Sequence, residues 1–281
     1  AFLKDSLSRH KLSSYDDKTG RGYLRNVLVR TSERTKECLV AFVANEDNKD
    51  LLAPLTAELI EAFPKNLVGI LLNVNTRPGN TILGPKNIIL HGRDFLRESL
   101  LDLEFHISVG SFFQVHTDQA ERLFTAAIGM AELTGTETAL DAYCGTGVLA
   151  LAISARVKRV IGVESHVGSV ADAKENARRN GIENATFIAA DATDYLRKEN
   201  TALDIVFLDP PRKGCDGGFL EAIAQSTATK LIYISCDPST MARDISLLQK
   251  LGFALKTLQP VDLFPETAHV ECIARLDRVK P

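Results

Sequence analysis

The chain has 281 residues, 45% of them hydrophobic and 25% charged, which is ordinary for a globular protein. No stretch approaches the roughly 20 apolar residues that a membrane-spanning helix needs, and no signal segment opens the chain. We therefore expect a cytoplasmic protein without membrane contact. The net charge of −3 excludes a general electrostatic attraction of the whole molecule to nucleic acid.

The cysteine pattern argues against a disulfide framework and against a metal or iron–sulfur centre. The five cysteines are Cys38, Cys144, Cys215, Cys236 and Cys272. Their number is odd, they are far apart, and no two form a CxxC pair. Each cysteine is thus either a buried core residue or a reactive thiol.

Residues 1–107 are predicted to form a smaller α+β domain. Strands are expected at 26–32 and 38–45, joined by the polar turn "SERTKE", and a third at 67–75. The apolar spacing of 51–63 predicts a helix between them. The first forty residues hold nine Lys or Arg against five acids, which is typical of either a phosphate-binding face or a solvated surface.

Residues 108–281 are predicted to form an α/β domain with a doubly wound, Rossmann-like sheet. Strands and helices alternate along this part of the sequence, which favours parallel strands. The strands are expected at 137–144, 159–165, 185–191, 203–211 and 230–236, with helices at 145–155, 167–180 and 237–252. Gly181 stands where a helix C-cap belongs.

Ligands of such sheets bind beyond the carboxyl ends of the strands. The predicted strands place five reactive side chains along this rim: Asp141, Glu164, Asp191, Asp209 and Cys236. The first strand leads into "DAYCGTGVLAL", in which Gly145 and Gly147 permit a tight bend close to a ligand. Three acids at successive strand ends beside a glycine turn indicate a nucleoside cofactor. Asp141 would repel a pyrophosphate, so S-adenosylmethionine is favoured over NAD.

Cys236 lies between a buried strand and the start of a helix, a place that is expected to lower the pKa of a thiol. Glu271 enters an otherwise apolar strand, where burial is costly unless the carboxylate has a partner or a chemical role. It could equally be an exposed strand end. Arg212 and Lys213 in "DPPRKG" could bind a phosphate or stabilise an anionic intermediate, or be surface cations.

From about residue 108 onward the chain resembles the RNA uracil-C5 methyltransferases, which make 5-methyluridine in tRNA or rRNA. The resemblance is carried by "SFFQVHTDQAERLF", "DAYCGTGVLAL", "FLDPPRKG", "YISCDPSTMARD" and "DLFPETAHVE". It extends upstream through "GRDFLRESLLDLEFHISVGSFFQV", and residues 1–100 look similar to the RNA-contacting central domain of the family.

The resemblance implies that Cys236 is the nucleophile and Glu271 the base. It also implies an S-adenosylmethionine site, lined by Gln114, Tyr143, Glu164, Asp191 and Asp209. Two family features are not present in this sequence, the N-terminal oligonucleotide-binding barrel and the four-cysteine iron–sulfur segment. Val148 stands where the family often has Asn, at one cofactor contact.

The expected partner is rRNA or tRNA, the expected oligomeric state is a monomer, and no metal is expected. The target base must leave any stack to meet the thiolate. Phe112, Phe113 or His116 could stack it, although core packing is favoured for the two Phe residues. Two alternatives remain: a methyltransferase of the same fold for amines or small molecules, in which Cys236 is a core residue, and a non-catalytic RNA-binding relative.

Overall fold

The computed structural model describes residues 2–199 and 201–279. The chain divides into two compact units. The N-terminal unit comprises Ala1–Ser99 and His106–Gly110, and the C-terminal unit comprises Leu100–Phe105 and Ser111–Pro281. The division runs through a two-stranded hairpin of β5 (Phe95–Leu100) and β6 (Leu103–Ser108). Among the described residues, no helix is long and apolar enough to cross a membrane.

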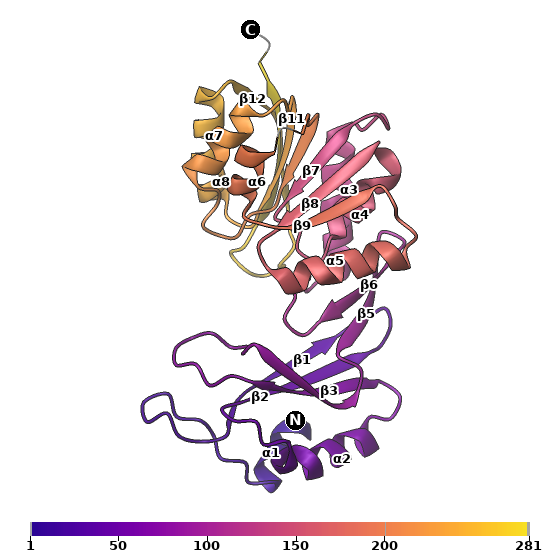
Figure 1. The fold of residues 1–281 in the computed structure, drawn as a ribbon, viewed down its shortest axis with the longest axis vertical. Helices are drawn as coiled ribbons and strands as arrows, with labels where there is room; N and C mark the ends of the chain where they lie inside the picture. The colour runs from indigo at the N-terminus through magenta and orange to yellow at the C-terminus, as the bar shows by residue number, and fades with distance from the viewer. Residues whose placement is uncertain (1, 200, 280–281) are drawn as a thin grey trace. The chain divides into compact units, whose positions relative to one another are not determined.

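The N-terminal unit is built on a four-stranded mixed sheet with the order β1-β2-β3-β4 (Figure 1). Its elements are α1 (Phe2–Arg9), β1 (Leu24–Thr31), β2 (Cys38–Ala44), the 3₁₀ turn η1 (Lys49–Leu52), α2 (Ala53–Ala62), β3 (Leu67–Val74) and β4 (Lys86–Gly92). The predicted polar turn joins the antiparallel strands β1 and β2, as expected. Apolar residues of both helices pack on one face of this sheet, which forms an α+β unit.

The C-terminal unit is built on a seven-stranded sheet with the order β12-β13-β11-β10-β7-β8-β9. Five neighbouring strands, β11 to β9 in that order, are parallel, whereas β13 runs antiparallel to both of its neighbours, β11 and β12. The strands are β7 (Thr138–Ala142), β8 (Arg159–Glu164), β9 (Ala185–Ala189), β10 (Ile205–Leu208), β11 (Lys230–Ser235), β12 (Phe253–Val261) and β13 (Glu271–Arg278). The predicted doubly wound α/β class is confirmed, with an antiparallel pair added at one edge.

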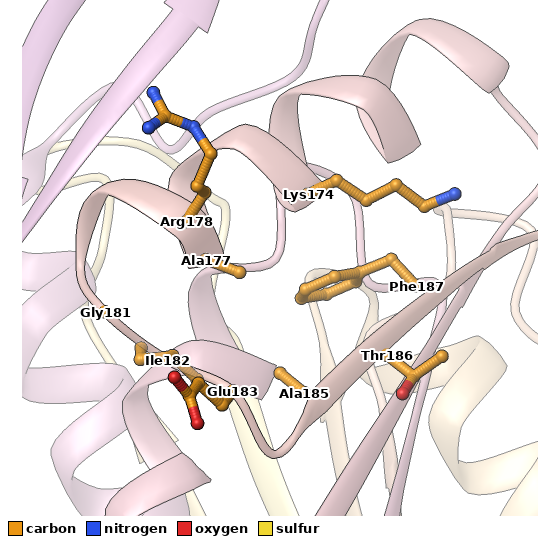
Figure 2. Close-up of a pocket in the computed structure, with 9 residues that line it drawn as sticks. All are labelled: Lys174, Ala177, Arg178, Gly181, Ile182, Glu183, Ala185, Thr186 and Phe187. Carbon is orange, nitrogen blue, oxygen red and sulfur yellow. The ribbon is translucent and has the colours of Figure 1, made fainter.

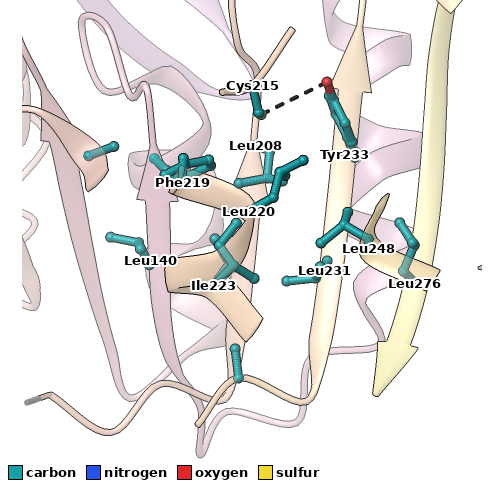
Figure 3. Packing of buried hydrophobic residues seen from close by; sticks show 14 of the residues in the cluster. Leu140, Leu208, Cys215, Phe219, Leu220, Ile223, Leu231, Tyr233, Leu248 and Leu276 are labelled. Carbon is teal, nitrogen blue, oxygen red and sulfur yellow. Dashed lines mark hydrogen bonds between the residues drawn. The ribbon is translucent and has the colours of Figure 1, made fainter. Parts of the chain in front are cut away.

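Helices cover both faces of this sheet. They are α3 (Thr117–Ala131), α4 (Val148–Ile153) with the 3₁₀ turn η2 (Ser154–Arg156), α5 (Val167–Arg179), α6 (Ala192–Lys198), α7 (Gly217–Gln225) and α8 (Pro238–Lys250). The core under α6, α7 and α8 joins helix residues such as Phe219 and Leu248 to Leu140, Leu208 and Leu231 of three strands (Figure 3). Packing on both faces explains why these strands are continuous apolar runs.

Local features of the sequence account for several helix ends. Gly181 follows the C-cap of α5 with φ of +64°, as predicted, because a residue without Cβ adopts this conformation at little cost. Pro238 opens α8, where its missing N–H is not needed. The helix expected at 145–155 is shorter, because Gly147 is its N-cap with φ of +85° and the chain before Val148 is a turn.

Candidate active site

The carboxyl ends of the parallel strands line up one rim of the C-terminal sheet. From the sheet order, the residues at this rim follow one another as Glu271, Cys236, Asp209, Asp141, Glu164 and Asp191. Glu271 belongs to this end because β13 is antiparallel to β11 and begins where β11 finishes. The rim predicted from the strand–helix alternation is therefore present.

The turn that follows β7 lies at the rim, and several of its residues have left-handed backbone conformations. Tyr143, Gly145 and Gly147 all have positive φ, at 71°, 52° and 85°. A Cβ on Gly147 would lie 3.0 Å from the ring of Phe187, so a larger residue would force the turn apart. Asp141, 1% exposed, accepts a hydrogen bond from the Ala150 amide at 2.9 Å and thereby ties the strand to α4.

Glu164 and Asp191 are held by backbone amides. One oxygen of Glu164 accepts from the His166 amide at 2.8 Å, and the other from the Gly145 amide at 3.3 Å. Asp191 caps α6 by accepting from the amides of residues 193 and 194. The hydrogen bond from the amide of residue 194 is the largest influence that lowers the pKa of Asp191. Each carboxylate keeps one oxygen with a further acceptor position for a ligand hydroxyl or amine, Oε2 of Glu164 and Oδ2 of Asp191.

The remaining predicted cofactor residues lie near the same sheet edge or lead into α3. The half-buried ring of Tyr143 meets Phe219 edge-on at 5.3 Å, and burial raises the pKa of its hydroxyl. Gln114 is half-buried three residues before α3. Packing against Phe219 thus holds the Tyr143 side chain, and its backbone forms the start of the glycine turn.

The aromatic residues before α3 differ in burial. Phe113 is buried and lies 5.8 Å from Phe105, as core packing predicts. Phe112 is 69% exposed, so the core assignment is wrong for this residue. His116 is the N-cap of α3 and accepts from the Gln119 amide.

Cys236 and Glu271 come together through strand pairing. Ser235 of β11 pairs with Cys272 of β13, so the next residue of β11 and the preceding residue of β13 meet at the same end. Cys236 is half-exposed, whereas Glu271 is 4% exposed. A partly exposed thiol therefore lies at the same strand end as a carboxylate that is shielded from water, a combination that would suit a nucleophile and a base.

The pKa of the Cys236 thiol is raised, so the prediction of a lowered pKa is wrong. Burial raises it most, the charge of Glu271 adds to this, and the opposing charge of Arg212 lowers it. Two of the first amides of α8 are taken up by the Asp237 carboxylate, which accepts from the Ser239 and Thr240 amides. The negative charges from other strands could not be read from the local sequence.

Burial also raises the pKa values of the acids beside Cys236. It raises the pKa of Glu271, with Arg212 acting in the opposite direction. Burial and the charge of Glu271 raise the pKa of Asp209 to about 7. Burial, followed by the charge of Asp209, raises the pKa of Asp141 to about 8. Neighbouring carboxylates that cannot all ionise together are typical of sites that hold or exchange protons.

The cations of the loop between β10 and α7 differ in their surroundings. Arg212 is exposed, and its charge lowers the pKa values of both Cys236 and Glu271. Lys213 is exposed, and its carbonyl accepts from the Arg243 guanidinium at 2.9 Å. Sequence reasoning did not single out Arg243 and its neighbour Asp244. The available signal was an acid within the apolar stripe of α8, which includes Met241, Ile245 and Leu248.

A surface hollow lies at the other end of β9, away from these residues (Figure 2). It is lined by α5 and the segment entering β9, namely Lys174, Ala177, Arg178, Gly181, Ile182, Glu183, Ala185, Thr186 and Phe187. None of the predicted site residues lines it. Within residues 2–199 and 201–279, no group of three or more His, Cys, Asp or Glu side chains could hold a metal ion.

The chain matches a known protein family over most of its length. The family model described as tRNA (Uracil-5-)-methyltransferase matches residues 84–279, well over half of the chain. The chain belongs to this family.

Curated relatives match nearly the whole chain. An uncharacterized RNA methyltransferase of Gloeobacter violaceus is 44% identical over 99% of this chain and 60% of its own length. One of Listeria innocua is 39% identical over 99% of this chain and 61% of its own length. The chain thus spans about three fifths of the length of these family members.

A solved structure shares the fold. The crystal structure of Pyrococcus abyssi tRNA (uracil-54, C5)-methyltransferase in complex with S-adenosyl-L-homocysteine matches with a TM-score of 0.79 and 29% identity. It covers 98% of this chain, which corresponds to 65% of the other chain. The predicted family membership and fold class are confirmed by these matches.

Proposed function

We propose that this protein transfers a methyl group from S-adenosylmethionine to C5 of a uridine in structured rRNA or tRNA, through a covalent adduct between Cys236 and C6 of the uracil. The observation that carries the proposal is the pairing of β11 with β13, which sets the reachable Cys236 beside the buried Glu271. The acidic residues that follow this pair along the same rim support the same chemistry.

Uracil C5 is a weak nucleophile, and Cys236 changes this by addition. The thiolate sulfur forms a bond to C6, and the electron pair of the C5–C6 double bond moves toward O4 as an enolate. C5 then carries the electron density that forms the new carbon–carbon bond. Arg212, whose charge favours the ionised forms of Cys236 and Glu271, would also stabilise this anion.

Glu271 completes the reaction by removing the C5 proton. The electrons of that C–H bond rebuild the C5–C6 double bond, and the C6–S bond breaks with its electron pair returning to Cys236. Burial raises the pKa of the Glu271 carboxyl, so its carboxylate is a stronger base than an exposed one. The half-buried Asp209 carboxyl, with a pKa of about 7 and electrostatically coupled to Glu271, can share the proton that is removed.

The cofactor residues suit a cation better than a pyrophosphate. The carboxyl groups of Asp141, Asp209 and Glu164 gather at the strand ends, where phosphates would be repelled. A sulfonium would instead favour the ionised forms of Asp141 and Asp209, whose pKa values are raised by burial. Glu164 and Asp191 would bind ribose and adenine groups, and Gln114, Tyr143 and the Gly145 turn would complete the site. S-adenosylmethionine supplies an electrophilic methyl group to C5, and the electron pair of its breaking C–S bond stays on sulfur.

The RNA would be bound by groups on both parts of the chain. Arg212 and Lys213 would contact the target nucleotide or its phosphates, and residues 1–107 would act as an RNA-contacting domain. The P. abyssi relative acts on tRNA at uracil 54 according to its name, which supports an RNA substrate here. The target base would be flipped out of its stack to reach Cys236.

The decisive experiment is mass spectrometry of the protein incubated with S-adenosylmethionine and rRNA or tRNA containing 5-fluorouridine. Fluorine at C5 cannot leave as a proton, so the methylated adduct should accumulate on Cys236. Sequencing the trapped RNA would identify the modified uridine. Cys236→Ser should give no adduct.

The matched control is Cys38→Ser, because Cys38 is the other half-exposed cysteine and lies in the N-terminal unit. This variant should form the adduct at the normal rate. Full methylation of RNA by Cys236→Ser would overturn the covalent mechanism. Methylation of an amine or small molecule without any RNA adduct, under conditions where S-adenosylmethionine binds, would replace the RNA substrate.

A further inference from the structure

The loop between β10 and α7 is bound to α8 along its length. This loop, residues 209–216, carries Arg212. The Thr240 hydroxyl donates to the Arg212 carbonyl at 3.2 Å. The Arg243 guanidinium donates to the carbonyl of Lys213 at 2.9 Å and to that of Cys215 at 3.2 Å. Three carbonyls of the loop are therefore bound by two side chains from consecutive turns of one helix.

A buried carboxylate completes this attachment. Asp244 is 1% exposed, and one of its oxygens accepts from the Cys215 amide at 2.8 Å and from the Tyr233 hydroxyl at 2.7 Å. Its other oxygen accepts from Arg243 at 2.7 and 2.8 Å. The Cys215 thiol also approaches the Tyr233 hydroxyl at 3.9 Å (Figure 3). Asp244 is thus a paired charge with several donors, the condition under which a buried ion is tolerated.

Gly214 shows how closely the loop meets the helix. Its φ is +73°, and a Cβ built on it would lie 2.6 Å from both the Arg243 guanidinium and the Asp244 carboxylate. The loop can occupy this position only with glycine there, because any side chain would strain the backbone and displace the ion pair.

The attachment matters because α8 follows directly on Cys236. The groups that act on the thiol are Glu271 of β13, and Arg212 and Asp209 of the loop. Arg212 is the cation among them, and its side chain is exposed, so its own packing does not fix its place. Its backbone, however, is joined to the helix that begins two residues after Cys236.

We propose that Arg243 and Asp244 are positioning residues that hold the 209–216 loop against α8 and so keep the Arg212 guanidinium beside Cys236 and Glu271. The inference extends the proposed uracil-C5 chemistry by naming residues that tune its nucleophile without touching substrate. Arg243 and Asp244 affect Cys236 and Glu271 only by fixing the position of Arg212.

The test is the pH dependence of alkylation of Cys236 by iodoacetamide, measured by peptide mass spectrometry on the whole protein. This reagent is neutral, so its approach does not depend on local charge. Arg243→Ala should raise the pKa of the thiol by about half to one unit, which reduces the alkylation rate below that pKa by about three- to tenfold. Because Arg243 also pairs with the buried Asp244 carboxylate, the thermal unfolding curve of Arg243→Ala is measured alongside.

A double-mutant cycle separates positioning from a direct effect of charge. In an Arg212→Ala background, Arg243→Ala should cause no further change in the alkylation profile. Lys250→Ala removes one cation from the exposed far end of α8 and should leave the profile unchanged. Gly214→Ala should reproduce the effect of Arg243→Ala, because its Cβ displaces the same contacts.

The inference is overturned if Arg243→Ala behaves like Lys250→Ala, or if its full effect persists without Arg212. Alkylation needs neither RNA nor S-adenosylmethionine, so these results stand even if no RNA adduct forms. Where methyl transfer is measured, Arg243→Ala should lower kcat and leave the KM for S-adenosylmethionine unchanged. A general structural defect would alter both, together with the thermal unfolding curve.

Discussion

The two halves of the strand rim hold their carboxylates in different ways. In the half proposed to bind the cofactor, called the cofactor half and formed by β7, β8 and β9, Asp141, Glu164 and Asp191 each accept hydrogen bonds from backbone amides. In the reactive half, formed by β10, β11 and β13, the state of Asp209 and Glu271 is set mainly by burial, and by charge from Glu271 and Arg212 respectively.

The comparison distinguishes two properties of a carboxylate, its position and its protonation state. A carboxylate bound by amides has a fixed position and is suited to recognise ligand hydroxyls. A buried carboxylate near other charges has a protonation state that neighbouring residues can shift, which suits proton transfer. Asp141 is intermediate, because it is held by an amide and also has a raised pKa.

The largest expected effect is that of Glu271→Gln in the reactive half. Glutamine keeps the shape of the side chain but cannot take the C5 proton, so methyl transfer should fall by about 10²- to 10⁴-fold. The RNA adduct at Cys236 should persist, as detected by mass spectrometry with unmodified RNA. Glu266→Gln, on the exposed loop before β13, is the matched control. Normal turnover by Glu271→Gln would show that another group is the base.

Arg212→Ala should move the acidic limb of the pH–rate profile to higher pH. The charge of Arg212 lowers the pKa values of Cys236 and Glu271, and both groups react in their ionised forms. Removing the cation therefore raises both pKa values, and the rate on the acidic limb should fall by about three- to tenfold.

Lys213→Ala removes the same charge from the next residue of the loop and is compared with Arg212→Ala. It should weaken RNA binding, seen as a higher KM, without moving the acidic limb. An unshifted limb in Arg212→Ala would show that the reactive half is not tuned by this cation.

Asp141→Asn should change how stability depends on pH. The folded protein holds a proton on Asp141 up to a pKa of about 8, against an ordinary value of 3.8. Its contribution is complete below about pH 4 and is lost as the pH rises through 8. Asparagine can still accept from the Ala150 amide but does not titrate. The melting temperature of the variant should therefore fall less steeply than that of the original protein between pH 4 and 9. Parallel curves would place Asp141 with the purely amide-bound acids.

The smallest effect is expected for Asp191→Ala in the cofactor half. Loss of the N-cap of α6 should cost about 1 kcal/mol of unfolding free energy, measured by denaturant titration. Asp191→Asn keeps a capping oxygen and should preserve stability. If Asp191→Asn still weakens S-adenosylmethionine binding, the negative charge serves the cofactor as well as the helix. Equal stability of all three proteins would show that the cap contributes nothing measurable.

The sheet of the C-terminal unit could be predicted because its parallel strands are buried on both faces and read as apolar runs. The edge strand β12 was not predicted, since six of its nine residues, from Leu255 to Pro260, are exposed and show no apolar alternation. Strands β5 and β6 were missed because Arg97, Glu98 and Glu104 interrupt the apolar pattern, and β4 was missed because its apolar run, Ile88–Leu90, is short.

The places of the candidate site residues at the strand ends could be predicted from the sequence, because the strand–helix alternation and the motifs locate them. Their roles are predictions from the family resemblance. The environment of Cys236 could not be found. The local sequence indicates the helix that follows Cys236, but it does not show that Asp237 caps this helix. Nor does it show the charge of Glu271, which belongs to a strand that begins 35 residues later in the chain. Asp244 was missed because its donors come from a loop and a strand that only the fold brings together.

The antiparallel pairing of β11 with β13 fixes the relative positions of Cys236 and Glu271. The register of the two strands, from the pair Lys230 and Asp277 to the pair Ser235 and Cys272, determines that Cys236 and Glu271 meet at the end of the ladder. The loop from 262 to 270 takes no part in this pairing, so its length can vary without changing where the two groups meet. A single residue inserted within β13 would instead turn Glu271 to the opposite face of the sheet.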